Sequence, residues 1–243
     1  MANADFSSGP TVTAYGGKVG TTFAGAGTVY LETAAEGAGG GRLVVDASNA
    51  LVKNATVQQT VIGSEVTGDQ VGSVVVANAA KLYLDSGRTL SVSGDWLNSA
   101  TFASALGGTV RFVGSGAARI CGVNDFANLT CTEPGKTLRF GTDGSRLNII
   151  SGGTLTLSGD ETSALVLDRE GETGLWPLAL APGSSMALTF LDVSNSDARF
   201  GAVEAFMVET PELKSTQGIF GNPPFLHSDL DVANPIEVSA IDY

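Results

Sequence analysis

The sequence contains one histidine, two cysteines and few charged side chains, and each scarcity excludes a class of protein. A single histidine cannot build a multi-histidine metal site, and two cysteines cannot build a four-thiolate zinc site. Charged residues are 16% of the 243 residues, and 25 acidic against 13 basic side chains give a net charge of −12. Binding to nucleic acid requires clustered basic side chains, so we expect no nucleic-acid partner.

Long apolar runs and a glycine repeat of period three are also missing. The longest uncharged run, residues 173–191, is interrupted by Pro177, Pro182 and Gly183, which a bilayer helix would not tolerate near its centre. We therefore expect no membrane span. The 32 glycines have no every-third-residue period, which excludes collagen. Residues 1–10 are polar and lack the apolar centre of a secretory signal.

Alternation of apolar and polar residues, by contrast, runs along most of the chain. Segments such as 89–92, 109–112 and 154–157 alternate with the period of two that half-buried strands show. Turn sequences at 85–87 and 151–153 separate such segments, because Gly, Asn, Asp and Ser favour turns. With 43% hydrophobic residues, the chain has enough apolar surface to bury a core. We predict an all-β protein with short strands of about four to five residues.

A degenerate internal repeat distinguishes between all-β architectures. Residues 87–94, 108–114, 135–141 and 153–159 each begin with glycine, continue with a threonine–hydrophobe alternation and end with glycine. Repeats of one short strand and one turn indicate a solenoid, whose stacked coils bury a shared apolar column. We predict a single-stranded, right-handed parallel β-helix with about 20 to 25 residues per coil. The alternative is a β-sandwich, which usually has longer strands and broader loops.

The composition changes near residue 205 and predicts two parts. We assign residues 1–205 to the β-helix, with residues 1–20 as a candidate N-terminal cap. Residues 206–243 contain four prolines and break the repeat, so we expect an irregular segment or a cap there. Inward-facing side chains of a β-helix form ladders along its axis, because alternate residues of a strand face the same side. The predicted ladder residues are Leu82, Leu84, Leu90, Val92, Val110, Phe112, Leu138, Phe140, Leu147, Ile149, Leu155 and Leu157.

Three segments resemble units of β-helical repeat segments in very long exported or cell-surface bacterial proteins. Residues 25–33 (GAGTVYLET) and 41–46 (GRLVVD) resemble their GAGTIYLKT…G.LIIDN unit. Residues 108–116 (GTVRFVGSG), with Phe126 and the Asn-Leu-Thr that follows it, are similar to a GTVVFNGSG…F.NLT unit. Trp176 and the later FLDVSNSDA resemble a W.L…V.YVDVSDSNA coil. The resemblance covers roughly residues 20 to 200 in order. It implies a secreted or surface β-helix and transfers no catalytic residue.

Paired carboxylates are the candidates for catalysis, because cleavage of polysaccharides by carboxylate pairs needs two acids in one cleft. The candidate pairs are Asp160 with Glu161, and Asp192 with Asp197. Both pairs lie at turns, where acids ordinarily bond the turn backbone, so we assign no catalytic residue. Asp192 and Asp197 are also the candidate ligands for Ca²⁺, and no other cofactor is expected. His227 lies without the Gly-x-Ser-x-Gly context that some Ser-His-Asp triads show.

Cys121 and Cys131 flank a predicted turn and leave two interpretations open. In an exported protein they form a disulfide, whereas at ladder positions they remain neutral buried thiols. Aromatic residues also allow two interpretations, because rings exposed side by side stack on sugars and rings turned inward fill a core. The aromatic candidates are Trp96, Trp176, Tyr83 and Phe225.

These observations favour a structural role over a catalytic one. We expect a non-catalytic, adhesin-like β-helix segment of an exported or surface bacterial protein, located outside the cell or on its surface. A carbohydrate or another surface protein would be its partner. The alternatives are a polysaccharide lyase or glycoside hydrolase of β-helix fold, and a glycan-binding module.

Overall fold

The structure, a computed structural model, describes residues 12–47, 56–100, 106–142, 145–171, 174–197 and 213–214. Within these ranges every regular element is a β-strand, which confirms the all-β prediction. The same ranges contain no helix that is long and apolar enough to cross a membrane.

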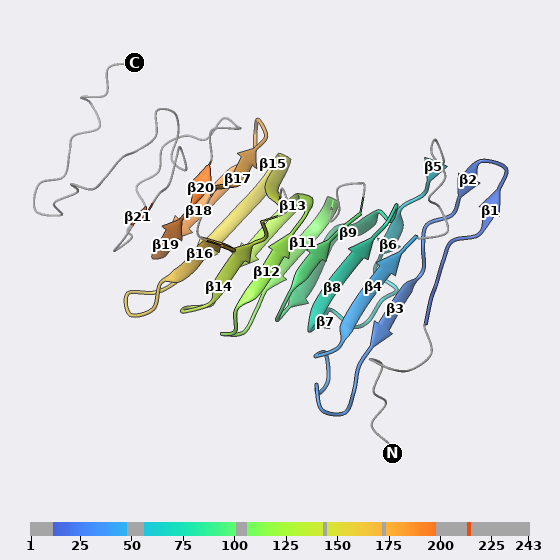
Figure 1. Ribbon diagram of the computed structural model, residues 1–243, viewed down its shortest axis with the longest axis horizontal. Helices are drawn as coiled ribbons and strands as arrows, with labels where there is room; N and C mark the ends of the chain where they lie inside the picture. The colour runs from blue at the N-terminus through green and yellow to red at the C-terminus, as the bar shows by residue number, and fades with distance from the viewer. Residues whose placement is uncertain are drawn as a thin grey trace, which may run out of the picture.

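Two sheets of nine strands each make up most of the described chain (Figure 1). Sheet I contains β3 (Thr28–Leu31), β4 (Arg42–Asp46), β8 (Ser73–Ala77), β10 (Trp96–Asn98), β12 (Ala118–Cys121), β14 (Thr137–Phe140), β16 (Leu165–Arg169), β19 (Leu191–Ser194) and β21 (Leu213–Lys214). Sheet II contains β6 (Thr60–Ile62), β7 (Gln70–Val71), β9 (Leu82–Val92), β11 (Leu106–Phe112), β13 (Val123–Cys131), β15 (Arg146–Ser158), β17 (Trp176–Leu180), β18 (Ser185–Thr189) and β20 (Ser196–Asp197). A small third sheet joins β1 (Lys18–Val19), β2 (Thr22–Phe23) and β5 (Thr56–Val57).

Successive strands from β8 to β17 alternate between sheet I and sheet II. Strands within a sheet pair in parallel, so Trp96 of β10 aligns with Val74 of β8 on one side and Ile120 of β12 on the other. Paired positions are therefore separated by roughly 20 to 30 residues of chain. Among the described pairs, antiparallel pairing is confined to β1–β2 and β3–β4. A β-sandwich would instead be mostly antiparallel.

Four strands, β9, β11, β13 and β15, are longer than the four to five residues that the sequence predicts. The expected turns at 85–87 and 151–153 lie inside β9 and β15, where Gly87 and Gly152 have positive φ angles of 82° and 74°. The two halves of β9 pair separately with β6 and β7, and those of β15 pair with β17 and β18. Both turns are therefore bends inside continuous strands.

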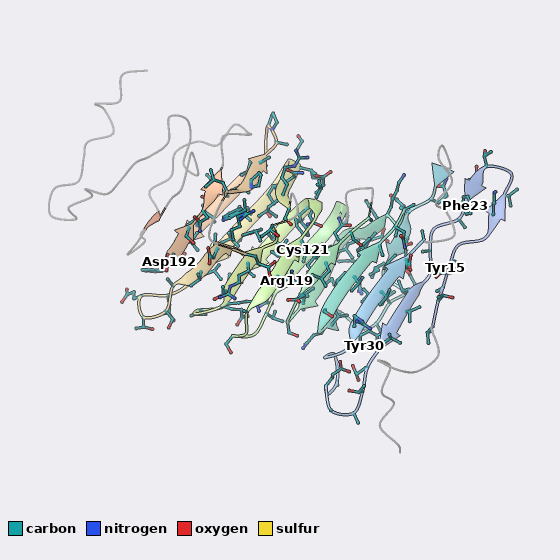
Figure 2. The ribbon with its side chains drawn as sticks, viewed as in Figure 1. Tyr15, Phe23, Tyr30, Arg119, Cys121 and Asp192 are labelled. Carbon is teal, nitrogen blue, oxygen red and sulfur yellow. The ribbon has the colours of Figure 1, made fainter. Side chains whose placement is uncertain are left out.

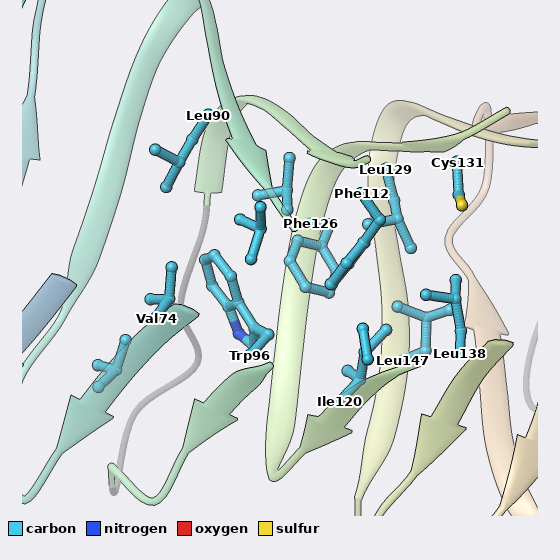
Figure 3. Packing of buried hydrophobic residues seen from close by; sticks show 14 of the residues in the cluster. Val74, Leu90, Trp96, Phe112, Ile120, Phe126, Leu129, Cys131, Leu138 and Leu147 are labelled. Atoms are coloured by element: carbon cyan, nitrogen blue, oxygen red, sulfur yellow. The ribbon is translucent and has the colours of Figure 1, made fainter. Parts of the chain in front are cut away.

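The core lies between the two sheets, whose inward side chains point toward one another (Figure 3). All twelve predicted ladder residues are buried and belong to one cluster. Aromatic side chains contact one another within this cluster. Trp96 meets Phe126 edge to face at 5.4 Å between ring centroids, and Phe140 stacks on Trp176 at 3.9 Å. Such contacts add to the hydrophobic burial that stabilises the column.

The segment 206–243, expected to be irregular or a cap, contains one described element. β21 pairs in parallel with β19, so Leu213 aligns with Val193. Phe225 and His227 lie outside the described residues.

Candidate functional site

The candidate acids Asp192 and Asp197 lie on strands of different sheets. Asp192 belongs to β19 of sheet I (Figure 2), and Asp197 belongs to β20 of sheet II. A third carboxylate organises the turn between them. Asp168 Oδ1 accepts hydrogen bonds from Ser194 Oγ at 2.7 Å and from Asn195 Nδ2 at 3.2 Å. Partial burial opposes ionisation of Asp168, but the hydrogen bonds from Ser194 and its other donors lower its pKa overall. The arrangement stabilises a turn.

Asp160 and Glu161 occupy the exposed turn between β15 and β16. Asp160 Oδ1 accepts three hydrogen bonds of 2.8 Å, from the backbone and hydroxyl of Thr162 and from the backbone of Ser163. The hydrogen bonds from Thr162 lower the pKa of Asp160, so its carboxylate stays ionised. A general acid needs the opposite shift. In the ranges that the structure describes, no three His, Cys, Asp or Glu side chains converge on a metal position.

The two cysteines are thiols and lie on different sheets. Cys121 ends β12 in sheet I, and Cys131 ends β13 in sheet II. Both are buried, and no disulfide joins them in the structure. Burial raises the pKa of the Cys131 thiol to about 11, which keeps it neutral and unreactive at physiological pH.

Both tryptophans are core residues and do not form a sugar-stacking surface. Trp96 donates from Nε1 to Asn124 Oδ1 at 2.8 Å, and Trp176 donates from Nε1 to the Ser194 carbonyl at 2.9 Å. These bonds satisfy the one polar atom of each buried ring. Tyr83 is half-buried on β9.

Lys136, which the sequence did not single out, is fully buried just before β14. Its Nζ donates to four backbone carbonyls at 2.9 to 3.1 Å, those of Ser93, Val113, Gly114 and Gly116. Burial lowers the pKa of Lys136, whereas four carbonyl acceptors favour the charged ammonium. The side chain thereby joins the turns after β9 and β11 to the start of β14.

Sheet II presents two outward rows of mostly small polar side chains across β9, β11, β13, β15 and β18, here called the hydroxyl face. The inward residues between these rows, such as Leu90 and Val110, are buried, so the alternate positions face solvent. Strand register aligns the rows from β9 to β18. One row contains Thr89, Thr109, Asn128, Thr154 and Ser185, and the other contains Ser91, Arg111, Thr130, Thr156 and Ala187. Repeated hydroxyl and amide groups at strand spacing can bind a repeating polar ligand.

A cavity of about 520 Å³, here called the N-terminal groove, opens between the β3–β4 hairpin and the β6–β7 segment. Tyr30 on β3 aligns with the core residue Leu43 on β4 and therefore faces the inner side of sheet I. In sheet I, β3 lies beyond β4, whereas sheet II ends at β6. Tyr30 is consequently 44% exposed (Figure 2). Val61, Val66, Glu32 and Asp69 also line the groove.

Hydrogen bonds fix the polar rim of the groove. The Tyr30 hydroxyl donates to the Glu32 carboxylate and accepts from the Gly41 backbone at 3.0 Å. Glu32 Oε2 also accepts from the Gly39 backbone at 2.8 Å. Desolvation and the hydrogen bond to Glu32 raise the pKa of Tyr30, so the phenol stays neutral. A mainly apolar cavity of this volume is of the size that holds a ligand or a partner side chain.

Comparisons with protein-family models, with curated proteins and with solved structures found no match.

Proposed function

We propose that the chain is a right-handed parallel β-helix that serves as a rigid, adhesin-like segment of an exported or cell-surface bacterial protein. The observation that supports it is the alternation of parallel strands between two sheets around one apolar column. Each strand then bonds to the strands of neighbouring coils, so the backbone is satisfied along the stack. Such a stack of hydrogen-bonded strands resists bending and holds its outward rows of side chains at a fixed spacing, as a surface scaffold requires.

Small-angle X-ray scattering tests the elongated architecture. A compact domain of this length has a radius of gyration of about 18 Å. A β-helix gives a larger radius together with the cross-section of a rod. A globular profile near the compact value would contradict the proposal.

A glycan-binding module is the second candidate, and the hydroxyl face favours it. Its uncharged hydroxyls donate and accept hydrogen bonds, and its rows repeat at the strand spacing of about 4.8 Å. That spacing is close to the length of one hexopyranose unit in an extended polysaccharide. The net charge of −12 favours an uncharged polysaccharide over an acidic one, because like charges repel.

Sedimentation with insoluble cellulose and chitin tests this second candidate. The double variant Thr130→Val and Thr156→Val keeps the side-chain shape and removes two hydroxyls from one row, so we expect the bound fraction to fall severalfold. Thr137→Val on β14 of sheet I is the matched control and should bind as the unsubstituted protein does. Equal binding by all three proteins would contradict a role for the hydroxyl face.

The enzyme alternative is tested on the same materials. Release of soluble sugars or of unsaturated products from neutral and acidic polysaccharides would replace the scaffold with a lyase or hydrolase. We expect no release above the buffer control.

A further inference from the structure

Exposed apolar side chains gather at the N-terminal end of the described chain. Of the seven large hydrophobic side chains that the structure shows as exposed, six lie between residues 12 and 66. Three of these, Tyr30, Val61 and Val66, line the N-terminal groove, with exposed fractions of 44%, 44% and 38%. The seventh, Val123, lies on β13 and is 43% exposed. Clustered exposed apolar side chains beside a cavity mark an interaction site.

The groove also borders a strand edge. β6 is the last strand of sheet II on this side, and it pairs with β9. The Thr60 N–H donates to the Lys81 carbonyl at 2.7 Å, toward β9. Successive backbone groups of a strand point to opposite edges, so the N–H and C=O of Val61 point away from β9. Residues 25 and 26 lie against the chain just before Val61, because Thr60 Oγ donates to the Ala26 carbonyl and a Cβ on Gly25 would overlap the Gln59 carbonyl oxygen. At Val61 itself, the described residues show no strand partner on this side. An edge of this kind accepts an added strand.

The charge of the groove selects among peptides. The ionisable carboxylates that line it belong to Glu32 and Asp69, and the whole chain carries a net charge of −12. A basic segment is therefore attracted and an acidic one repelled. The peptide must also alternate apolar and basic residues, because every second side chain of an added strand would face the groove.

We propose that the N-terminal groove binds an extended peptide segment of another protein, in which apolar residues alternate with Lys or Arg. The segment pairs with the backbone of Val61 at the edge of β6. An apolar side chain enters the cavity beside Tyr30 and Leu43, and basic side chains lie near Glu32 and Asp69. This interaction is independent of the β-helical scaffold role and of glycan binding.

A fluorescent eight-residue peptide that alternates Lys and Val is the probe, with a Glu–Val peptide of the same length as its counterpart. Fluorescence anisotropy should show saturable binding of the basic peptide and at least about tenfold weaker binding of the acidic one. Hydrogen exchange should show slower exchange at residues 60–62 when the basic peptide is bound, which is the mark of strand pairing.

Substitutions at matched exposed valines separate the groove from general charge attraction. Val61→Lys repels the basic peptide, and Val61→Pro removes the edge N–H; each should weaken binding by about tenfold or more while the far-UV circular dichroism stays unchanged. Val123→Lys adds the same charge away from the groove and should leave affinity within about twofold.

Three results would overturn the proposal: no saturable binding, equal affinity for both peptides, or equal losses in Val61→Lys and Val123→Lys. A concentration-dependent dimer that Val61→Lys abolishes, without peptide binding, would assign the groove to self-association instead. None of these results bears on the scattering test of the β-helix.

Discussion

Four backbone carbonyls surround the Lys136 ammonium in a position that water does not reach. Removing an ammonium from water costs several kcal/mol, and a buried lysine commonly meets this cost with a carboxylate partner. Here neutral carbonyl dipoles stabilise the charge, and the charge in turn satisfies carbonyls at turns that strand pairing leaves open. Lys136 is therefore a structural residue of the turn region.

Lys136→Met is expected to lower the free energy of unfolding by about 3 kcal/mol, because buried carbonyls lose their donor. Urea unfolding followed by circular dichroism measures the change. Lys18→Met is the control: Lys18 is exposed and lies over the Phe23 ring at 5.2 Å, so the same substitution should cost about 1 kcal/mol or less. Equal effects of the two substitutions would contradict a stabilising role for the hydrogen bonds between Lys136 and the four carbonyls.

Cys131 predicts a fall in stability at alkaline pH. Its thiol has a pKa of about 11 in the folded protein, against 9.0 for an unfolded thiol. Between these values the unfolded chain loses the proton while the folded chain keeps it, so rising pH favours unfolding. Cys131→Ala should flatten the dependence of the urea midpoint on pH between about 9 and 11. Parallel curves for the two proteins would refute the assignment.

For single residues, the sequence predicts well which apolar side chains face inward. It predicts poorly which polar side chains are buried. Leu138 and Phe140 are buried because alternation fixes which side of a strand they face. Lys136 lies just before the same strand, and a lysine side chain is ordinarily expected to be exposed to solvent. Asp168 was not singled out either, because its donors Ser194 and Asn195 come from a later strand and turn. Contacts between strands that are far apart in the chain decide both positions, and local sequence does not contain them.

At the scale of elements, glycines permit close approach between neighbouring strands. Gly122 joins β12 to β13 with a φ of 82°, and a Cβ at this position would overlap the carbonyl oxygen of Asn98 on β10. Gly87 has the same φ of 82° within β9, but a Cβ there would meet open space. Substitutions at the two positions therefore distinguish the cost of backbone strain from the cost of steric overlap.

Gly122→Ala is expected to destabilise the protein by about 3 kcal/mol or more, through strain and overlap together. Gly87→Ala should cost about 1 kcal/mol, from the left-handed backbone alone. Thermal and urea unfolding of both variants measure the difference. If Gly87→Ala costs as much as Gly122→Ala, close packing between strands does not determine the cost of substitution at Gly122.

Strand positions follow the predicted alternation, but joins between strands do not. The sequence indicates turns near Gly87 and Gly152, and in the structure each glycine bends a strand that continues pairing beyond it. The antiparallel pairing of β3 with β4 is equally invisible to a periodicity argument, because residues of either pairing mode alternate in the same way. Pairing partners, which determine both features, lie far apart in the chain.

For the whole molecule, the N-terminal groove shows why a cavity escaped the sequence. Its residues come from the β3–β4 hairpin, the β6–β7 segment and β9, and no single motif contains them. The groove exists because one sheet extends further than the other. That mismatch depends on where the pairing of each sheet ends, a property of the assembled fold.

The excess of acidic residues predicts that salt stabilises the folded chain. Net charge of −12 produces self-repulsion that counterions screen, with a Debye length of about 10 Å at 0.1 M salt. In the described part of the chain, the ion pair that salt would weaken joins Arg119 and Glu170 at the surface, and such pairs contribute little. Raising sodium chloride from about 0.02 to 0.5 M should therefore raise the urea midpoint. A lower midpoint would show that attractive pairs dominate.

The bends at Gly87 and Gly152 provide two positions on sheet II where peptides could be inserted. Each is open to solvent, and three strand-to-strand steps in sheet II separate β9 from β15, a distance of about 14 Å. Peptide epitopes inserted at the two glycines would project from one stiff support at a known separation. The molecule thus provides a support for bivalent display, in which the spacing of the two epitopes is set by the number of strands between them.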